Sequence, residues 1–461
     1  MSSNAKATFN AAGWREHVRP LPTSVSVRRS YLGVHSPLSL RLWMLLWLIA
    51  GGASALAALN QSGPDHLVFG VAAAFGAWTF LFSGGNHIDP LGVWGLAFAV
   101  FVGGAGFLMP DAVFAANAGG LLPLSVALFF AQVVIVVVAW SAQGSRQFNF
   151  KSRATQLPLE QAFWVGVFTY LLGVALELVG DSDFALGLML TAPLLVAAGT
   201  KKAAGRKRAG AAVVLMLGGY SFFFWNGFGR ILLAQAILSV MIVIAADGKR
   251  NLTKVAVLIG ATGYVSSQGD LLRRFLVDVL GLSGRGVDRG AESVWSPLLR
   301  AGQILDLVER GIHDPTWFDT FTAALVSWIP RRFWQDKPYG WGRDLAEFFA
   351  PEYVQSGHSE AGLALGEFLW AFGLVGIAVY VLTISLVIRL LQISFYRILS
   401  HSGWGDSLSI AYLITVLAAA NLLSLFWTGT FTYIARLLIM TAPLFALWLV
   451  LRVRQHLRSD L

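Results

Sequence analysis

Long apolar runs, each about as long as a bilayer is thick, constrain this chain more than any other feature. A hydrocarbon core of about 30 Å requires about 20 apolar residues per helix. Twelve such runs, bounded by charge, proline or Gly-Asn clusters, lie at 42–59, 66–84, 90–109, 121–140, 160–179, 184–200, 209–226, 230–246, 253–269, 365–388, 409–427 and 433–451. The sequence therefore predicts an all-α, polytopic bundle of about 12 transmembrane helices.

The composition agrees with this class, because 56% of the residues are hydrophobic and only 13% are charged. These values exclude a water-soluble globule. The chain has no cysteine, which excludes disulfides, thiolate catalysis and cysteine-ligated metals. The net charge of +9 is spread over short connecting segments, so it indicates topology and contact with the lipid bilayer and implies no nucleic-acid partner.

The distribution of Lys and Arg predicts how the bundle is oriented, because cytoplasmic connections carry an excess of cations. With the N-terminus inside, the inward segments carry 22 of the 34 cations, and ten more lie in one long outward segment. Both termini are therefore expected in the cytoplasm of a bacterium, with the chain in its inner membrane. The predicted domains are a basic tail at 1–41, nine spans at 42–269, a large periplasmic loop at 270–360, three spans at 361–451 and a cytoplasmic tail at 452–461. The first tail is expected to be disordered, with a lipid-binding amphipathic helix as the alternative.

The loop at 270–360 is much longer than a connection between two helices needs to be. It holds thirteen acidic residues against ten cations. The spacing of Leu299, Ile304 and Leu307, and of Leu325 and Ile329, predicts short amphipathic helices at the mouth of the bundle. Long loops carry function, so we expect a binding site here; a structural cap without a ligand is the alternative.

Two arginines break the topological pattern. Arg230 opens the eighth predicted span at its outward end, and Arg436 lies one turn inside the outward end of the last span. An arginine in an apolar span costs about 2.5–3.5 kcal/mol and usually faces the bundle interior or a wet cavity, although each could also extend to the lipid headgroups. Together with Arg331 and Arg332 they predict an outward-facing anion site. A guanidinium matches phosphate oxygens in two hydrogen bonds, so a lipid-linked diphosphate is a natural ligand.

A histidine and a carboxylate end the long loop, and a second carboxylate follows it. His358 in a partly wet pocket could take a proton from a hydroxyl near neutral pH, and Glu360 could hold its tautomer. Glu360 and Glu367 are seven residues apart, so they would share one face if the next helix begins early. A surface histidine without a catalytic role is the alternative.

These segments resemble those of a known family. The run His358–Gly376 resembles the part of the O-antigen ligase and Wzy-type polymerase superfamily in which a histidine ends the large periplasmic loop and a glycine-containing run enters the next helix. The run Ile329–Pro338 is similar to the Pro-Arg-x-x-Trp-x-x-Lys-Pro pattern of bacterial oligosaccharide repeat-unit polymerases, and Gly229-Arg230 is similar to the Ser/Gly-Arg that begins a middle helix. The resemblance covers the twelve-span plan and about 220–390 in detail.

The resemblance implies a glycosyltransferase of the GT-C type that polymerises oligosaccharide repeat units on the periplasmic face, for O-antigen or exopolysaccharide. Its donor and acceptor would be glycans on undecaprenyl diphosphate, and it would use no metal or other cofactor. A chain-length regulator protein is a potential partner. The diphosphate-binding residues would be Arg230, Arg331, Arg332, Lys337 and Arg436. The catalytic group would come from His358, Glu360 and Glu367.

Polymerase and ligase differ at one motif. Ligases usually have His-Asn where this chain has His358-Ser359, which leaves His358 and Glu360 as alternative bases, and the Lys337-Pro338 run favours a polymerase.

A metal-nucleotide motif and a transport function are the two other possibilities that the sequence raises. Asp181-Ser182-Asp183 has the Asp-x-Asp pattern of metal-nucleotide sites but lies in a short turn, so we expect no metal there. A flippase or secondary transporter of about twelve helices remains an alternative, although transporters show repeated halves and mid-membrane charges. Here nine spans precede the long loop and three follow it, and Glu177 is the main mid-span acid.

Overall fold

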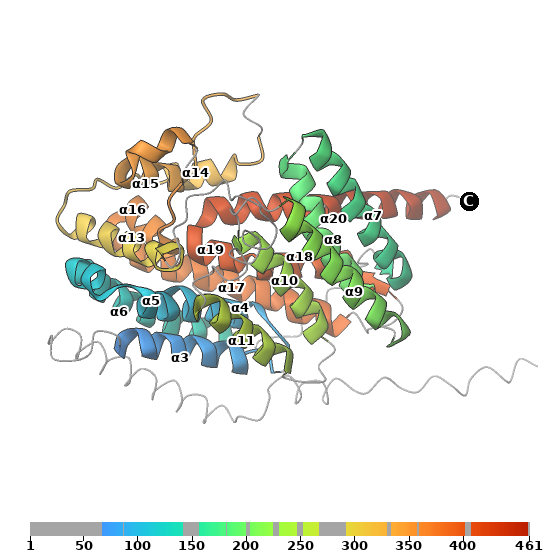
Figure 1. Ribbon diagram of the computed structural model, residues 1–461, viewed down its shortest axis with the longest axis horizontal. Helices are drawn as coiled ribbons and strands as arrows, with labels where there is room; N and C mark the ends of the chain where they lie inside the picture. Colours follow the sequence, from blue (N-terminus) through green and yellow to red (C-terminus); the bar gives the residue numbers. More distant parts are fainter. Residues whose placement is uncertain are drawn as a thin grey trace, which may run out of the picture.

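The computed structural model describes residues 67–85, 87–141, 156–180, 182–199, 203–224, 230–246, 252–266, 292–329, 333–356, 359–401 and 407–459. Almost every segment among them is helical, and the helices form one bundle (Figure 1). Outside the described residues lie the predicted tail at 1–41, the first predicted span at 42–59, Asp181, the Arg331-Arg332 pair and His358.

The first part of the bundle comprises the helices between residues 67 and 266. In chain order they are α3 (Leu67–Phe82), α4 (Pro90–Phe98), the π-helix η1 (Ala99–Gly104), α5 (Ala105–Leu108), α6 (Asp111–Ser141), α7 (Leu159–Val179), α8 (Ser182–Ala198), α9 (Ala203–Gly219), the π-helix η3 (Tyr220–Phe224), α10 (Arg230–Ala245) and α11 (Leu252–Ser266).

The second part contains the long predicted loop and the last spans. Its helices are α13 (Glu292–Glu309), α14 (Asp319–Leu325), α15 (Trp341–Phe349), the 3₁₀ turn η4 (Pro351–Ser356), α16 (Leu363–Phe372), the 3₁₀ turn η5 (Gly373–Val375), α17 (Gly376–His401), α18 (Ile410–Ala420), α19 (Leu422–Thr428) and α20 (Thr430–Ser459). Helix α13 contains the predicted repeat of Leu299, Ile304 and Leu307, whereas α14 ends at Leu325, so Ile329 of the second predicted repeat lies beyond that helix.

The predicted spans coincide with helices where the structure describes them. The run at 160–179 is α7, the run at 230–246 is α10, and the run at 433–451 lies inside α20. Among the described residues, six stretches are long and apolar enough to cross a membrane: Pro90–Leu108, Asp111–Trp140, Gln161–Val179, Leu363–Leu399, Ile410–Thr428 and Thr430–Val453. Shorter apolar stretches lie in α3, α8 and α10. The chain is thus a helical membrane protein, and the total of twelve spans stays a prediction.

One small element departs from the all-α prediction. Strand β1 (Gln156–Pro158) pairs antiparallel with β2 (Ser407–Ser409), with Leu157 opposite Leu408. Strands of three residues are too short to produce a recognisable alternating pattern, so the sequence did not predict them. The pair joins the segment before α7 to the segment before α18.

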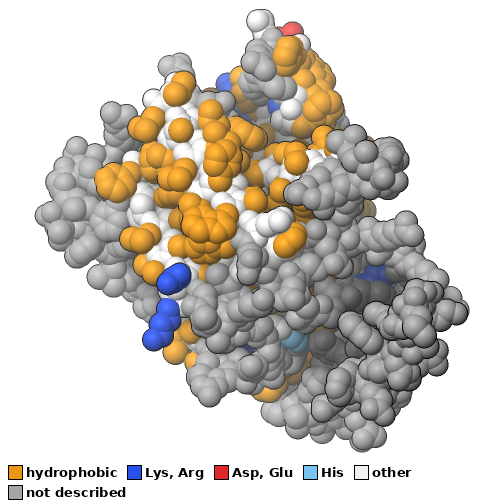
Figure 2. All heavy atoms as spheres, turned by 90° about the vertical axis from the view of Figure 1, so that its right-hand side faces the viewer, with side chains coloured by type: hydrophobic (Ala, Val, Ile, Leu, Met, Phe, Trp, Pro, Cys, Tyr) orange, Lys and Arg blue, Asp and Glu red, His pale blue; other side chains and the backbone are white. Residues whose placement is uncertain are grey.

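The outer surface of the helices has the character expected of lipid contact. On α7 the exposed side chains include Trp164, Phe168 and Leu171, which repeat at helical spacing and are 60–69% exposed. Figure 2 shows a broad field of hydrophobic side chains on one face of the molecule. Without a bilayer such a field would favour association, and within one it is the expected surface.

A sharp break separates α16 from α17, where the sequence predicted one continuous span at 365–388. The rings of Phe368 and Tyr380 lie 5.7 Å apart, whereas twelve residues of straight helix would separate them by about 18 Å. The chain turns at Gly373, whose φ of 61° favours glycine. The freed carbonyls of Trp370 and Ala371 accept hydrogen bonds from the backbone N–H groups of Thr316 and Trp317, at 3.3 and 2.7 Å. Residues from the long segment therefore complete the end of α16.

A group of buried polar residues around Asp89 holds the connection between α3 and α4. Asp89 caps the N-terminus of α4 by accepting from the Gly92 N–H at 2.8 Å. It also accepts from the Tyr396 hydroxyl of α17 at 2.7 Å. Lys254 of α11 donates to the carbonyls of Leu81 and Ser83 at the end of α3. Four helices are tied together at this point.

Candidate functional site

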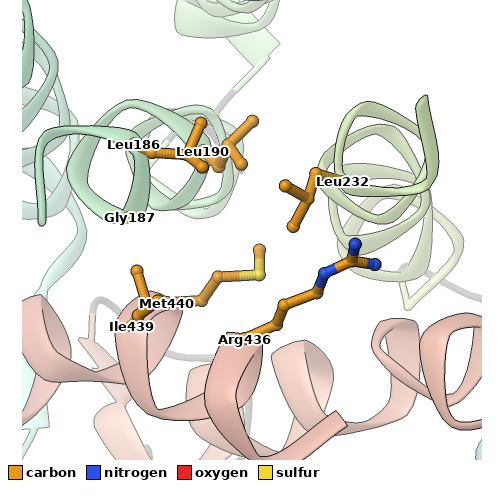
Figure 3. A pocket seen from close by; sticks show the side chains of 7 residues that line it. All are labelled: Leu186, Gly187, Leu190, Leu232, Arg436, Ile439 and Met440. Atoms are coloured by element: carbon orange, nitrogen blue, oxygen red, sulfur yellow. The ribbon is translucent and has the colours of Figure 1, made fainter. Parts of the chain in front are cut away.

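Arg436 lines a cavity of about 170 Å³ between α8, α10 and α20 (Figure 3). The other lining residues are apolar: Leu186, Gly187, Leu190, Leu232, Ile439 and Met440. In Figure 3 the guanidinium of Arg436 points across the cavity toward Leu232 on α10. The arginine that the sequence singled out on α20 therefore faces the interior of the bundle.

A buried hydrogen-bond network from α10 and α19 holds the Arg436 side chain in place. Its Nη1 donates to Ser424 Oγ at 2.6 Å. Gln235 Nε2 of α10 donates to the same oxygen and to Asn421 Oδ1, the latter at 2.7 Å. Asn421 Nδ2 in turn donates to the Tyr433 carbonyl at 2.7 Å. Gln235, Asn421 and Ser424 are fully buried, so the guanidinium is held in one place by groups that water does not reach.

Arg230 is the first residue of α10, and its side chain lies outside the described part of the chain. Its backbone is two residues from Leu232, which forms the cavity wall opposite Arg436. The fold therefore brings the first turn of α10 and the first turns of α20 to the same cavity. The Arg331-Arg332 pair of the same predicted anion site lies outside the described residues, just after Ile329 in the sequence.

Glu360 forms an ion pair that the sequence did not suggest. Its Oε2 lies 3.6 Å from Arg300 Nε on α13, and the Glu360 side chain is 3% exposed. The guanidinium of Arg300 also lies over the ring of Phe349, 4.8 Å from its centroid. The Glu360 N–H donates to the Gly342 carbonyl at 2.8 Å. Glu360 is thus anchored to α13 and to the start of α15.

Glu367 is fully buried and caps α20. Its Oε2 accepts from the Thr430 N–H and its Oε1 from the Thr430 hydroxyl, both at 2.7 Å. Beside it the Trp341 indole donates to the Thr428 carbonyl at 2.5 Å. The chain turns between α19 and α20 at Gly429, whose φ is 91°, and a Cβ there would collide with Glu367 Oε2. We call this turn, Thr428–Thr430, the α19–α20 elbow.

Lys337 contacts backbone in the structure. Its ammonium donates to the carbonyls of Ser327 and Ile329, each at 2.9 Å, and the side chain is 7% exposed. Buried carbonyls outside a helix need such donors. Lys337 therefore holds the turn that follows α14.

One carboxyl outside the spans has a clearly shifted pKa. Burial raises the pKa of Asp344 on α15 to about 6, and the neighbouring carboxylates of Glu347 and Asp319 add to the shift, while Arg343 opposes it. At neutral pH this carboxyl is still mainly ionised, but it would be protonated in mildly acidic surroundings.

The site therefore has two parts that meet at the α19–α20 elbow. Glu367 holds the elbow from the side of α16, and Arg436 is bonded to Ser424 within α19 and projects into the cavity. Glu360 and Glu367 flank the adjacent residues Trp341 and Gly342 at the start of α15. Among the predicted residues, Glu360 and Glu367 thus lie together near the start of α15. Arg436 lies at the cavity between α8, α10 and α20, and Lys337 lies at the turn after α14.

Sequence reasoning missed the residues that hold these groups. Arg300 lies within the amphipathic stretch that predicted α13, and its charge next to the apolar repeat was the available signal. Asn421 interrupts an otherwise apolar run in the predicted span at 409–427, and buried polar residues in spans are usually paired. For Gln235 the same signal existed in α10.

No three His, Asp or Glu side chains among the described residues lie close enough together to hold a metal ion. Comparison of the chain with protein-family models, with curated proteins and with solved structures finds no match.

Proposed function

We propose that the chain is a membrane glycosyltransferase that polymerises oligosaccharide units carried on undecaprenyl diphosphate, on the outward side of the bilayer. One observation carries the proposal: a single guanidinium, that of Arg436, is aimed into an otherwise apolar cavity between α8, α10 and α20. An isoprenoid diphosphate combines the same two properties, an apolar chain and a compact anion. The resemblance of 329–338 and 358–376 to repeat-unit polymerases supports the same conclusion.

In the proposed reaction the acceptor hydroxyl attacks the anomeric carbon of the donor sugar. The bond from that carbon to the diphosphate oxygen breaks, and the hydroxyl proton goes to His358 or Glu360. The leaving diphosphate gains negative charge as the bond breaks. Arg436, which is held in place before the reaction, would stabilise that charge more than it stabilises the ground state. We expect Arg230 and the Arg331-Arg332 pair to add to this effect. Glu367 contributes by fixing the α19–α20 elbow, where α20, the helix that carries Arg436, begins.

Replacing Arg436 by alanine tests the proposal. We expect Arg436→Ala to abolish chain extension, because the cavity would lose its cation, and Arg436→Lys to retain partial activity, because a lysine keeps the charge but loses the two-pronged geometry. Arg310→Ala is the matched control, since this arginine is 66% exposed and pairs with Asp306 one helical turn away. Polymer length is measured on gels in cells that carry each variant, with membrane levels checked by immunoblot. Polymer of normal length from Arg436→Ala would contradict the proposal.

A flippase or secondary transporter is the second candidate. The breaks between α16 and α17 and between α18, α19 and α20 favour it, because discontinuous helices often form transport sites. The lipid-linked intermediate that accumulates after deletion separates the two. A polymerase deletion leaves single repeat units on the outward face, whereas a flippase deletion leaves them on the inward face.

A further inference from the structure

Helix α14 and the residues that flank it carry several large apolar side chains on the outside. Its buried residues are the small Thr320, Ala323 and Ala324, whereas Leu325 is 69% exposed. Phe318 just before the helix and Trp328 just after it are 67% and 68% exposed. A helix at a water-exposed surface shows the reverse pattern. We refer to Trp317, Phe318, Leu325 and Trp328 as the α14 apolar face.

The position of this face relative to the membrane follows from α17. The exposed large side chains of α17 recur every four residues, at Leu382, Leu386 and Leu390, and continue through the exposed pair Leu374 and Val375 just before the helix. The opposite side of α17 is buried. This stripe extends about 24 Å from 374 to 390 at 1.5 Å per residue, which approaches the thickness of a hydrocarbon core. Its outer end at 374–375 therefore marks the outer boundary of the apolar layer.

The α14 apolar face lies at that boundary. The rings of Trp317 and Phe318 contact the ring of Phe372, with centroids 6.2 and 5.4 Å apart. Phe372 directly precedes the turn that carries Leu374 and Val375. Phe321 of α14 also packs on Phe372, 5.7 Å away. The aromatic cluster is thus continuous with the lipid-facing stripe of α17.

The surroundings of the face are rigid and almost free of cations. The Trp317 N–H is bonded to the Ala371 carbonyl, and His313 Nε2 bonds to the Trp370 carbonyl at 2.8 Å, with its ring stacked on that indole. Lys337 clamps the turn beneath Trp328 through the Ser327 and Ile329 carbonyls. Residues 311–329 contain two aspartates and no Lys or Arg. Within 311–329 no Lys or Arg attracts anionic headgroups, so apolar burial is the driving force that these residues supply.

We propose that the α14 apolar face is a membrane-docking surface that rests in the outward boundary between headgroups and acyl chains. Trp and Phe are the residues that favour this layer. Docking would hold the long segment 292–356 against the bilayer, beside the helices α16 and α20. The inference rests on the helical membrane protein described above and on the predicted orientation of its long loop, and it does not depend on the proposed enzymatic activity.

The absence of cysteine from the chain allows a direct test. The full chain carrying Leu325→Cys is labelled with a nitroxide and placed in bilayers of phosphatidylethanolamine and phosphatidylglycerol, and the accessibility of the label to oxygen and to a water-soluble nickel chelate is compared. Leu386→Cys, in the middle of the α17 stripe, is the lipid control. Glu352→Cys, an exposed acidic position in η4, is the aqueous control.

We expect the oxygen-to-nickel ratio at 325 to lie between those of the two controls, and to be unchanged by salt. A membrane-impermeant maleimide should react about tenfold more slowly at 325 than at 352. Trp328→Cys repeats both measurements from the other end of the face. A ratio equal to that of the aqueous control at both positions would overturn the proposal. So would low access to both reagents, which would indicate a protein partner, or spin–spin broadening that disappears on dilution with unlabelled chain, which would indicate a second copy.

Discussion

At the scale of single residues, Glu367 shows how a group that looks catalytic in sequence can act by position. Both of its oxygens accept hydrogen bonds from Thr430. Glu367→Gln keeps one acceptor and leaves a buried donor facing a donor, so we expect a loss of about 1–3 kcal/mol of stability. We expect activity to fall by less than it does in Arg436→Ala. Thermal unfolding and polymer length, measured on the same variant, check the two parts. Complete inactivity at unchanged stability would show that Glu367 takes part in the chemistry.

Asp344 gives the segment 292–356 a dependence on pH. Its pKa is raised to about 6 in the folded protein from 3.8, so folding favours the protonated form. Its contribution to stability is fully present below pH 3.8 and is lost as the pH rises through about 6. We expect Asp344→Asn to remove this part of the pH dependence and to raise stability at pH 7, on the order of 1 kcal/mol after allowance for solvent screening. Thermal unfolding from pH 4 to pH 8 measures it, and an identical profile for both proteins would contradict the assignment.

At the scale of elements, the break between α16 and α17 depends on a close contact between backbones. A Cβ at Gly376 would collide with the Phe368 carbonyl, and a main-chain atom cannot move aside as a flexible side chain can. We expect Gly376→Ala to lower stability by several kcal/mol, roughly the cost of overpacking. Gly218→Ala on α9 is the matched control, because nothing lies within 4 Å of its Cβ position, and it should be neutral or stabilising by up to about 1 kcal/mol. Equal melting temperatures for the two variants would show that the contact is not as tight as described.

The same break explains what the sequence could and could not predict. Hydropathy located α7, α10 and α20 well, because each helix is defined by its own apolar run. It could not locate the turn at Gly373, since 365–388 is apolar on both sides of that glycine and the turn is fixed by packing against α13 and by amide groups from residues 316–317. In the site, Arg436 was predictable as a charge in an apolar run. Its partner Ser424 is a small neutral residue of the preceding span, and Gln235 comes from a distant segment, so the sequence did not show that the three pack together.

At the scale of the whole molecule, the cation distribution predicts that both termini lie in the cytoplasm and that 270–360 lies outside. Reporter fusions test this, with alkaline phosphatase active only outside and green fluorescent protein fluorescent only inside. We expect fluorescence from a fusion after residue 461 and phosphatase activity from a fusion placed within 270–290. The reverse result at either position would contradict the predicted topology.

The outward-turned side chains of α14 have one more consequence. They are joined rigidly to α17, so their height above the inward end of that helix is fixed by a helix of 26 residues, about 39 Å long. A docking surface at a fixed height makes the protein sensitive to bilayer thickness. Lipids with shorter acyl chains would leave this surface in water, and lipids with longer chains would bury it in the hydrocarbon core. The acyl-chain length of the surrounding lipids would then change how the segment 292–356 sits against the bilayer, without any change in the amino-acid sequence.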